Sequence, residues 1–298
     1  MNAVDPFIAE CSKLIHQEQY DGMLWHYTTI DALLKIVQSG SIHLNCYSFM
    51  NDPSEGLRSP EFLTRCWRAA FAKLHNHPRL DLDYLRSAVD NLRDLMTRKD
   101  YDAFDFVFSA STLKDSLSQW ARYGGDGDGV ALGFQITATA FPPLPAGGWL
   151  YGPFLHEVIY DSGDGAAALE GAAAKLASNL ADLVVNFIPK LNNPTDAENA
   201  VFVVADILRP LLKHSGYREE AEWRISARTD KKSKQLYDLK ANRHGLAPFM
   251  KLPLGESVKL VEVMVGPKLS QDNSWSIEWL LHKHGVDAQV SRSQLAYR

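Results

Sequence analysis

Long hydrophobic runs, paired cysteines and an excess of positive charge are all missing from this chain of 298 residues. The three cysteines, Cys11, Cys46 and Cys66, are odd in number and unevenly spaced, so they predict neither a disulfide framework nor a zinc site. No run of about 18 apolar residues is present, and the first ten residues lack the basic and apolar regions of a signal peptide. We therefore expect a soluble, cytoplasmic protein that does not contact the membrane.

The charge balance also limits the possible partners. A net charge of −5 excludes a generally basic nucleic-acid-binding surface, although a local basic groove could still hold a nucleic acid. Basic residues are frequent between residues 60 and 99, but aspartates are interleaved with them, which favours a solvated helix face. Hydrophobic residues make up 46% of the chain, a value typical of globular proteins with a sizeable core.

The clearest local pattern runs from Leu24 to Leu44 and predicts a strand, a helix and a second strand. From Leu24 to Thr28 the aromatic residues Trp25 and Tyr27 alternate with the other three residues, as in a strand whose two faces differ. Thr28 followed by Asp31 is typical of a helix start, and Gly40 stands where helices commonly end. Because a helix N-terminus offers free N–H groups and a partial positive charge, this unit could hold a hydroxyl- or phosphate-bearing ligand.

Further patterns predict strands that are interrupted by helical segments. Strands are expected at residues 104–111, 129–136, 154–160, 217–226, 258–265 and 286–291. Helices are expected at 1–20, 60–76, 79–98, 115–123 and 273–283, with two or three more in the alanine-rich stretch 165–214. No repeat or low-complexity linker divides the chain, so we expect one domain over residues 1–298. Since strands and helices do not alternate regularly, the class is α+β.

His26, at the end of the first predicted strand, is the sharpest single candidate for a binding residue. A histidine at such a position can equally be satisfied by local hydrogen bonds within a half-buried strand. Its neighbours Trp25 and Tyr27 are expected in the core, because aromatic side chains dominate core burial. Position alone leaves both interpretations of His26 open.

The second candidate is the stretch 217–226, whose side chains alternate strictly. The alternation predicts a strand with Trp223 and Ile225 directed inward, and with Glu220 and Glu222 on the opposite face. The plainer interpretation is a solvated face with salt-linked charges. In the functional alternative, two carboxylates on one face point into a cleft. There one of them orients a ribose hydroxyl and stabilises a developing positive charge, while the flanking Arg218 and Arg224 keep it ionised.

Several motifs in a fixed order resemble the bacterial DUF2971 family, a domain family of unknown function. The resemblance covers the chain from about residue 22 to the C-terminus. It rests on Leu24-Trp25-His26-Tyr27-Thr28, Gly40, Asn51-Asp52-Pro53, Leu117-Ser118-Gln119-Trp120-Ala121-Arg122-Tyr123, Gly129-Val130-Ala131-Leu132-Gly133-Phe134, Glu222-Trp223-Arg224, Val265-Gly266-Pro267-Lys268 and Ser293 to Arg298.

The opening unit is also similar, more distantly, to the first motif of ADP-ribosyltransferases of the His-Tyr-Glu type. There a strand that carries histidine runs into a helix that ends in glycine. The resemblance implies that His26 binds the NAD ribose, with Tyr27 and Thr28 completing the motif. It further implies that Glu222 is the catalytic carboxylate and that Glu220 orients the acceptor.

The same resemblance implies a tyrosine that stacks on nicotinamide, and either Tyr123 or Tyr47 could serve. Ser109-Ala110-Ser111 resembles the serine-rich strand motif of the arginine-type branch, in which His26 would normally be an arginine. The implied fold is a split mixed β-sheet with helical insertions at about 60–99 and 165–214.

The function implied by this resemblance is that of an NAD-dependent ADP-ribosyltransferase or an NAD glycohydrolase-like enzyme, in phage defence or as a toxin. NAD would be a substrate, a protein or nucleic acid the acceptor, and no metal would be needed. The alternative is a non-catalytic module of a bacterial defence system that senses a nucleotide or binds a partner.

Overall fold

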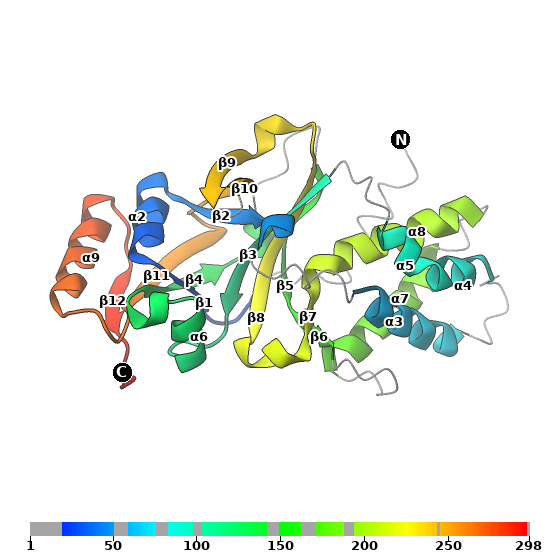
Figure 1. Ribbon diagram of the computed structural model, residues 1–298, viewed down its shortest axis with the longest axis horizontal. Coiled ribbons are helices and arrows are strands. Elements are labelled where there is room, and N and C mark those ends of the chain that lie inside the picture. Colours follow the sequence, from blue (N-terminus) through cyan, green and yellow to red (C-terminus); the bar gives the residue numbers. More distant parts are fainter. Residues whose placement is uncertain are drawn as a thin grey trace. The chain divides into compact units, whose positions relative to one another are not determined.

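The structure, a computed structural model, combines helices with a large mixed β-sheet and confirms the α+β class (Figure 1). It describes residues 20–50, 59–74, 83–97, 103–141, 149–161, 171–187, 194–242 and 245–296. The predicted helix at 1–20, except Tyr20, and the Asn51-Asp52-Pro53 motif lie outside these residues. The chain divides into a helical unit (1–16, 48–104 and 158–218) and a sheet unit (17–47, 105–157 and 219–298).

The helical unit contains both segments that were expected as insertions. Its helices are α3 (Ser59–Leu74), α4 (Asp83–Asp90), α5 (Leu92–Thr97), α7 (Gly171–Phe187) and α8 (Pro194–Leu208). Helix α3 packs against α7 and α4 packs against α8, around buried side chains such as Trp67, Leu180 and Val201. A short parallel pair of strands, β6 (Ile159–Asp161) and β7 (Leu212–His214), completes the unit. The helices predicted in 60–98 and 165–214 are confirmed, whereas the single-domain organisation stays a prediction.

The sheet unit contains ten strands in one sheet. They are β1 (Leu24–Thr28), β2 (Ser41–Cys46), β3 (Ala103–Ser111), β4 (Val130–Ile136), β5 (Trp149–Glu157), β8 (Glu222–Asp230), β9 (Asp238–Asn242), β10 (Gly245–Pro253), β11 (Val258–Val265) and β12 (Gln289–Arg292). The main path is β12-β11-β4-β1-β3-β2-β10-β9, and β8 pairs with both β3 and β5. The sheet is mixed because β12 runs parallel to β11 while β1 runs antiparallel to β3 and β4.

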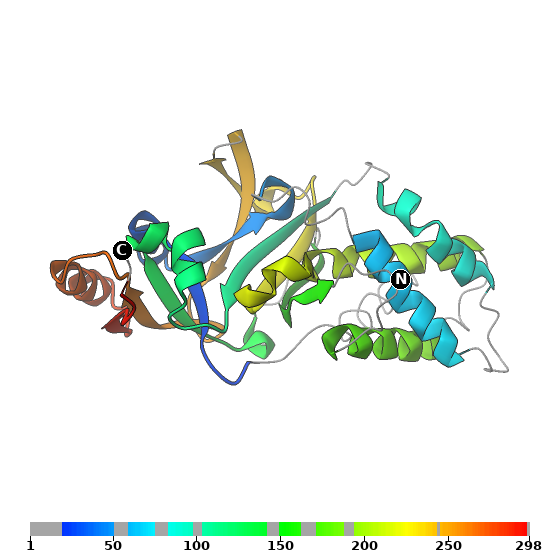
Figure 2. The same cartoon turned by 60° about the horizontal axis from the view of Figure 1, so that its bottom comes forward.

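The sheet branches at β3, the long strand that crosses the sheet unit in Figure 2. Strand β1 meets β3 where Trp25 lies opposite Ser111, whereas β2 meets it where Cys46 lies opposite Phe106. A strand has only two edges, and β3 has three partners, β1, β2 and β8. Strands β1 and β2 therefore follow different parts of β3, and the sheet divides where they separate.

Helix α2 (Ile30–Ser39) joins the two strands at this division. Its N-cap is Thr29, one residue after the predicted start at Thr28, and the Thr29 hydroxyl accepts the N–H of Ala32 at 3.2 Å. Gly40 ends the helix as predicted, with φ of 59° in the left-handed region that favours glycine. The unit from strand to helix to strand is thus confirmed, with its helix start displaced by one residue.

Two other sequence predictions need correction. Residues Ser215–Glu220 form a 3-10 helix, and β8 begins only at Glu222, so the strand predicted at 217–226 is wrong in its first half. Its polar face is also not solvated, because Glu222 and Arg224 are as deeply buried as Trp223 between them. The last strand is shorter than predicted and covers Gln289–Arg292.

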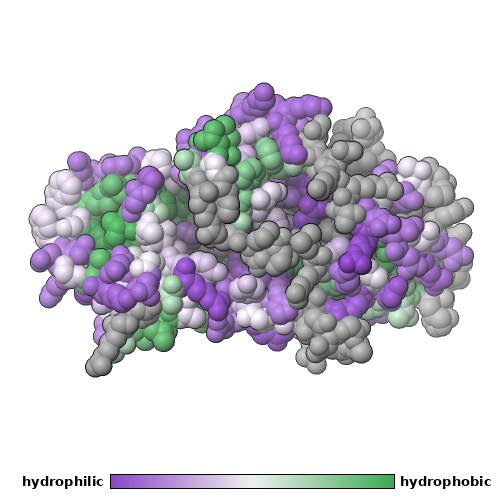
Figure 3. Space-filling view, viewed as in Figure 1, coloured by the Kyte–Doolittle hydropathy of each residue, from purple (hydrophilic) through white to green (hydrophobic). Residues whose placement is uncertain are grey.

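The surface of the sheet unit carries apolar side chains over two helices. Figure 3 shows hydrophobic residues between α2 and α9 (Asp272–Lys283). Ile30 and Leu34 of α2 are partly exposed. Trp275 and Trp279 of α9 are also exposed. Within the described ranges, no helix has the length and hydrophobicity needed to cross a bilayer.

Candidate active site

His26 lies on β1, next to the division of the sheet. Its Nδ1–H donates to the backbone oxygen of Ser109 at 2.8 Å, and its ring packs on Phe108 with 4.5 Å between the centroids. Because a carbonyl oxygen only accepts, this bond places the ring proton on Nδ1 and leaves Nε2 as an acceptor. Burial, together with the charge of Lys240, lowers the pKa of His26, so the imidazole is neutral at pH 7.

Tyr27 and Thr28 have different surroundings from His26. The Tyr27 ring is buried against Trp120 at 4.9 Å, and its hydroxyl donates to the Leu113 oxygen and accepts the N–H of Ser116. Both bonds occupy the hydroxyl, and burial raises the pKa of Tyr27 well above its usual value. Thr28 lies at the end of β1, opposite Val130 of β4. The structure thus places Tyr27 in the core, as its residue type predicts.

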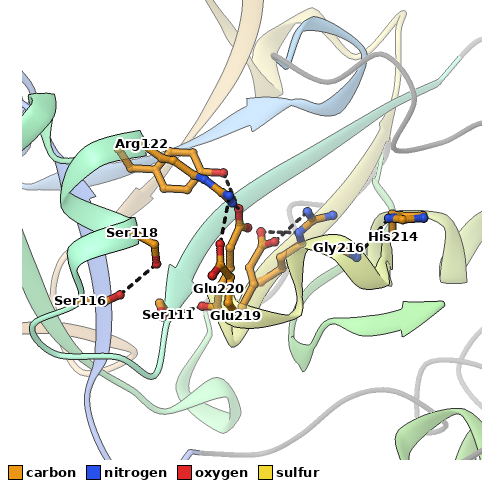
Figure 4. Close-up of polar contacts among 11 residues, drawn as sticks. Ser111, Ser116, Ser118, Arg122, His214, Gly216, Glu219 and Glu220 are labelled. Atoms are coloured by element: carbon orange, nitrogen blue, oxygen red, sulfur yellow. Dashed lines mark hydrogen bonds and ion pairs between the residues drawn. The ribbon is translucent and has the colours of Figure 1, made fainter. Parts of the chain in front are cut away.

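Glu220 is a buried carboxylate that is held from two directions (Figure 4). Its Oε1 accepts hydrogen bonds from Nη1 of Arg122 at 3.1 Å and from the hydroxyl of Tyr123 at 2.9 Å. Its backbone oxygen accepts the Ser111 hydroxyl at 2.6 Å. Arg122 also pairs with Glu219 at 3.0 Å and is 42% exposed. The carboxylate therefore lies beneath a partly exposed arginine and tyrosine from α6 (Leu117–Arg122) and the residue after it.

Ala221 turns the chain between the two glutamates. Its φ of 42° lies in the left-handed region, which is rare for residues other than glycine. The Ala221 oxygen accepts the N–H of Thr112 at 3.1 Å, just beyond the Ser111 contact. Two hydrogen bonds from the end of β3 thus hold an unfavourable backbone conformation, as is common at functional sites.

Glu222 and Arg224 form a buried two-point ion pair on β8. Arg224 Nε lies 2.7 Å from one carboxylate oxygen of Glu222, and Nη2 lies 3.1 Å from the other. The guanidinium carbon of Arg224 is 5.9 Å from the ring centroid of Tyr47, a cation–π distance. A planar fork of this kind fixes the carboxylate orientation and keeps it ionised.

Strand β3 connects the two halves of the site. The Ser109 oxygen holds His26, and the Ser111 hydroxyl holds Glu220. Further along, Asp105 pairs with Arg228 of β8, with contacts of 3.0 and 3.2 Å. Since alternate residues of a strand share a face, Asp105, Ser109 and Ser111 face the same side of the sheet.

The predicted site residues therefore form two neighbouring groups. Tyr123 contacts Glu220, while Tyr47 lies by Arg224, the partner of Glu222. The connection between His26 and Glu220 runs through β3, where the Ser109 oxygen accepts from His26 and the Ser111 hydroxyl donates to the Glu220 backbone oxygen. Among the residues that the structure describes, no group of three histidine, cysteine, aspartate or glutamate side chains is placed to hold a metal ion.

Two residues of the site were not predicted as functional from the sequence. They are Arg122 and Ser111, which hold Glu220. Both lie inside motifs used for the family resemblances, and Arg122 directly precedes the predicted Tyr123. Their pairing with Glu220 joins residues that are about a hundred positions apart, so it cannot be derived from sequence spacing. Arg224 was expected only as one of the arginines that keep a carboxylate ionised, and the structure shows its two-point contact with Glu222.

Comparison with known proteins gives one match. Residues 119–225 match the model of a family described as "Protein of unknown function (DUF2971)". No curated protein and no solved structure matches the chain. The matched segment contains Arg122, Tyr123, Glu220 and Glu222, so the carboxylate half of the site falls within it. The match supports the resemblance of this chain to the DUF2971 family.

Proposed function

We propose that the sheet unit binds NAD and cleaves its nicotinamide–ribose bond, as an ADP-ribosyltransferase or an NAD glycohydrolase. One observation carries the proposal: the end of β3 holds both His26 and the Glu220-Ala221-Glu222 turn, where the sheet divides. A ribose-binding histidine and a late glutamate brought together by a split sheet is the arrangement that the ADP-ribosyltransferase resemblance implies.

The neutral His26 suits the binding of a sugar. Its Nε2 can accept a hydrogen bond from a ribose hydroxyl, because its proton is held on Nδ1 by Ser109. Tyr123 is the better of the two candidates for stacking on nicotinamide, because the residue is 41% exposed while the Tyr47 ring faces Arg224. Tyr27 is left out of this role, since its ring and hydroxyl are both occupied in the core.

The chemical step requires stabilisation of positive charge on the ribose. The bond between C1′ and the nicotinamide nitrogen breaks, its electron pair leaves with neutral nicotinamide, and C1′ becomes oxocarbenium-like. Water or an acceptor nucleophile then adds to C1′ and loses a proton. The ionised Glu222 would stabilise the cation, and Glu220 would orient the attacking group. Because Arg224 already offsets the charge of Glu222, we expect slow basal turnover.

Nicotinamide release from NAD tests this proposal. Wild-type protein should release nicotinamide, and Glu222→Gln should do so about a hundred- to a thousand-fold more slowly. Glu256→Gln removes an exposed carboxylate elsewhere on the sheet unit and is the matched control. Thermal unfolding of each variant shows whether it is folded. Equal rates in wild-type protein and a folded Glu222→Gln variant would remove Glu222 from the mechanism.

A second function is favoured by the pairing of both carboxylates with arginine. Arg122 offsets Glu220 and Arg224 offsets Glu222, which suits a module that binds a nucleotide and leaves it intact. This module would act as a sensor or partner-binding component of a defence system. Calorimetric binding of NAD that is recovered unchanged by mass spectrometry would support the module over the enzyme.

A further inference from the structure

A second polar cluster in the sheet unit surrounds the ring of Phe249 on β10. The His43 ring lies 4.3 Å from its centroid, and the Nζ atoms of Lys240 and Lys251 lie at 5.4 and 5.8 Å. In the register of β2 and β10, His43 is opposite Lys251 and Asn45 is opposite Phe249. One face of the sheet therefore carries these five residues, which we call the Phe249 cluster.

The cluster has one cation without an opposing charge. Lys251 pairs with Asp238 at 2.7 Å, and Lys35 of α2 pairs with an aspartate of its own helix at 2.6 Å. Lys240 instead donates to the neutral side-chain oxygen of Asn45. Among the described parts of the chain, no carboxylate forms an ion pair with Lys240. Burial and the nearby Lys35 lower the pKa of Lys240. A bound anion would act in the opposite direction, because an opposite charge stabilises the protonated ammonium group.

His43 supplies a second group without a partner. Its Nε2 is buried and has no hydrogen-bond partner within the described residues. Burial and the charges of Lys240 and Lys251 lower the pKa of His43 to about 4, so its ring is neutral at pH 7. A neutral imidazole still carries one N–H. If that proton is on Nε2 of His43, the N–H could donate to an anionic oxygen, which would satisfy this buried atom.

We propose that Lys240, His43 and Lys251 form a binding site for the diphosphate group of a nucleotide. The charge of Lys240 is one of the causes that lower the pKa of His26, so Lys240 is within electrostatic range of the proposed ribose ligand. A ribose at His26 and a diphosphate at Lys240 are neighbouring parts of one dinucleotide. The assignment of the diphosphate to NAD rests on the proposed function, whereas the anion site itself does not.

Calorimetric titration of the full chain with inorganic pyrophosphate tests the site directly. Wild-type protein should bind pyrophosphate saturably, and Lys240→Met should bind at least about tenfold more weakly, because a charge-assisted hydrogen bond is lost. Lys240→Arg keeps the charge and should retain most of the affinity. Lys259→Met is the matched control, since it removes an exposed lysine from β11. His43→Phe keeps a ring on Phe249 but should also weaken binding.

The outcomes separate the anion site from the proposed reaction. Absence of saturable pyrophosphate binding by the wild type, or equal binding by Lys240→Met and Lys259→Met, would overturn the site. If pyrophosphate binding depends on Lys240 but NAD is neither bound nor cleaved, the site stands and the proposed function fails. If NAD is cleaved and its KM is the same in wild type and Lys240→Met, the function stands and the assignment of this site to the NAD diphosphate fails.

Discussion

The hydroxyl of Tyr123 donates to Oε1 of Glu220 at 2.9 Å, and this contact fixes an exposed ring over a buried carboxylate. A ring held in this way is available for stacking on one face. If Tyr123 stacks on nicotinamide, Tyr123→Ala should weaken NAD binding about tenfold or more, because stacking on an aromatic side chain contributes about 1–3 kcal/mol. Calorimetric titration with NAD measures the change.

Tyr123→Phe distinguishes the contribution of the ring to NAD affinity from that of the hydroxyl. It should keep most of the NAD affinity, because the stacking surface remains while only the bond to Glu220 is lost. A loss of affinity in Tyr123→Phe as large as in Tyr123→Ala would show that the hydroxyl, rather than the ring, carries the effect.

Ser111→Ala should destabilise the sheet unit by about 1–3 kcal/mol. Its hydroxyl donates to the Glu220 oxygen at 2.6 Å and accepts the N–H of Leu113 at 3.1 Å, so truncation leaves two backbone groups without this partner. Urea unfolding followed by circular dichroism measures the free energy. Ser118→Ala is the control, since the Ser118 hydroxyl bonds to another side chain, the Ser116 hydroxyl, and we expect a change within about 0.5 kcal/mol.

Much of the fold could be predicted from sequence because its signals are local. Alternation places β3 to within a residue of the prediction, and the strand predicted at 258–265 coincides with β11. The division of the sheet could not be predicted in this way. It depends on which parts of β3 pair with β1, β2 and β8, and such pairings join residues that are distant along the chain.

The site was predictable in composition but not in geometry. Arg218 and Glu220 continue the alternation of β8, so the sequence predicts a strand there. The strand is interrupted by bonds from Ser111 and Thr112, which hold Ala221 in the left-handed region. The plainer interpretation placed the charged side chain of Glu222 in solvent. The carboxylate is instead buried, and Arg224 supplies its opposing charge within the same strand.

Ala221→Gly should leave the protein as stable as the wild type or raise its free energy of unfolding by up to about 1 kcal/mol. Glycine adopts the φ of 42° at that position without steric cost, although it also loses more entropy on folding. Ala221→Val should destabilise it by more than about 1 kcal/mol, because a β-branched residue is least compatible with this region. Urea unfolding of both variants provides the comparison, and equal stabilities would show that the backbone there is not strained.

His43 should make the protein less stable as the pH falls from about 6.5 to about 4. Its pKa is lowered from 6.5 to about 4 on folding, so in this window the unfolded chain binds a proton that the folded chain does not. The free energy of unfolding therefore rises with pH across the window and is independent of His43 above it. In His43→Gln, urea unfolding at several pH values should show a smaller loss between pH 6.5 and 4. An unchanged pH profile would contradict the shift.

Glu222 and Arg224 should be strongly coupled in stability. Removing one partner of a buried ion pair leaves an uncompensated charge, which typically costs about 3–5 kcal/mol. Glu222→Gln and Arg224→Gln should therefore each destabilise the protein, while the double variant should lose less than the sum of the two. A double-mutant cycle from urea unfolding measures this coupling. The double variant also tests the proposed mechanism, because it removes the Glu222 carboxylate without leaving a buried cation. Strictly additive losses would show that the fork between the two side chains contributes nothing to the folded state.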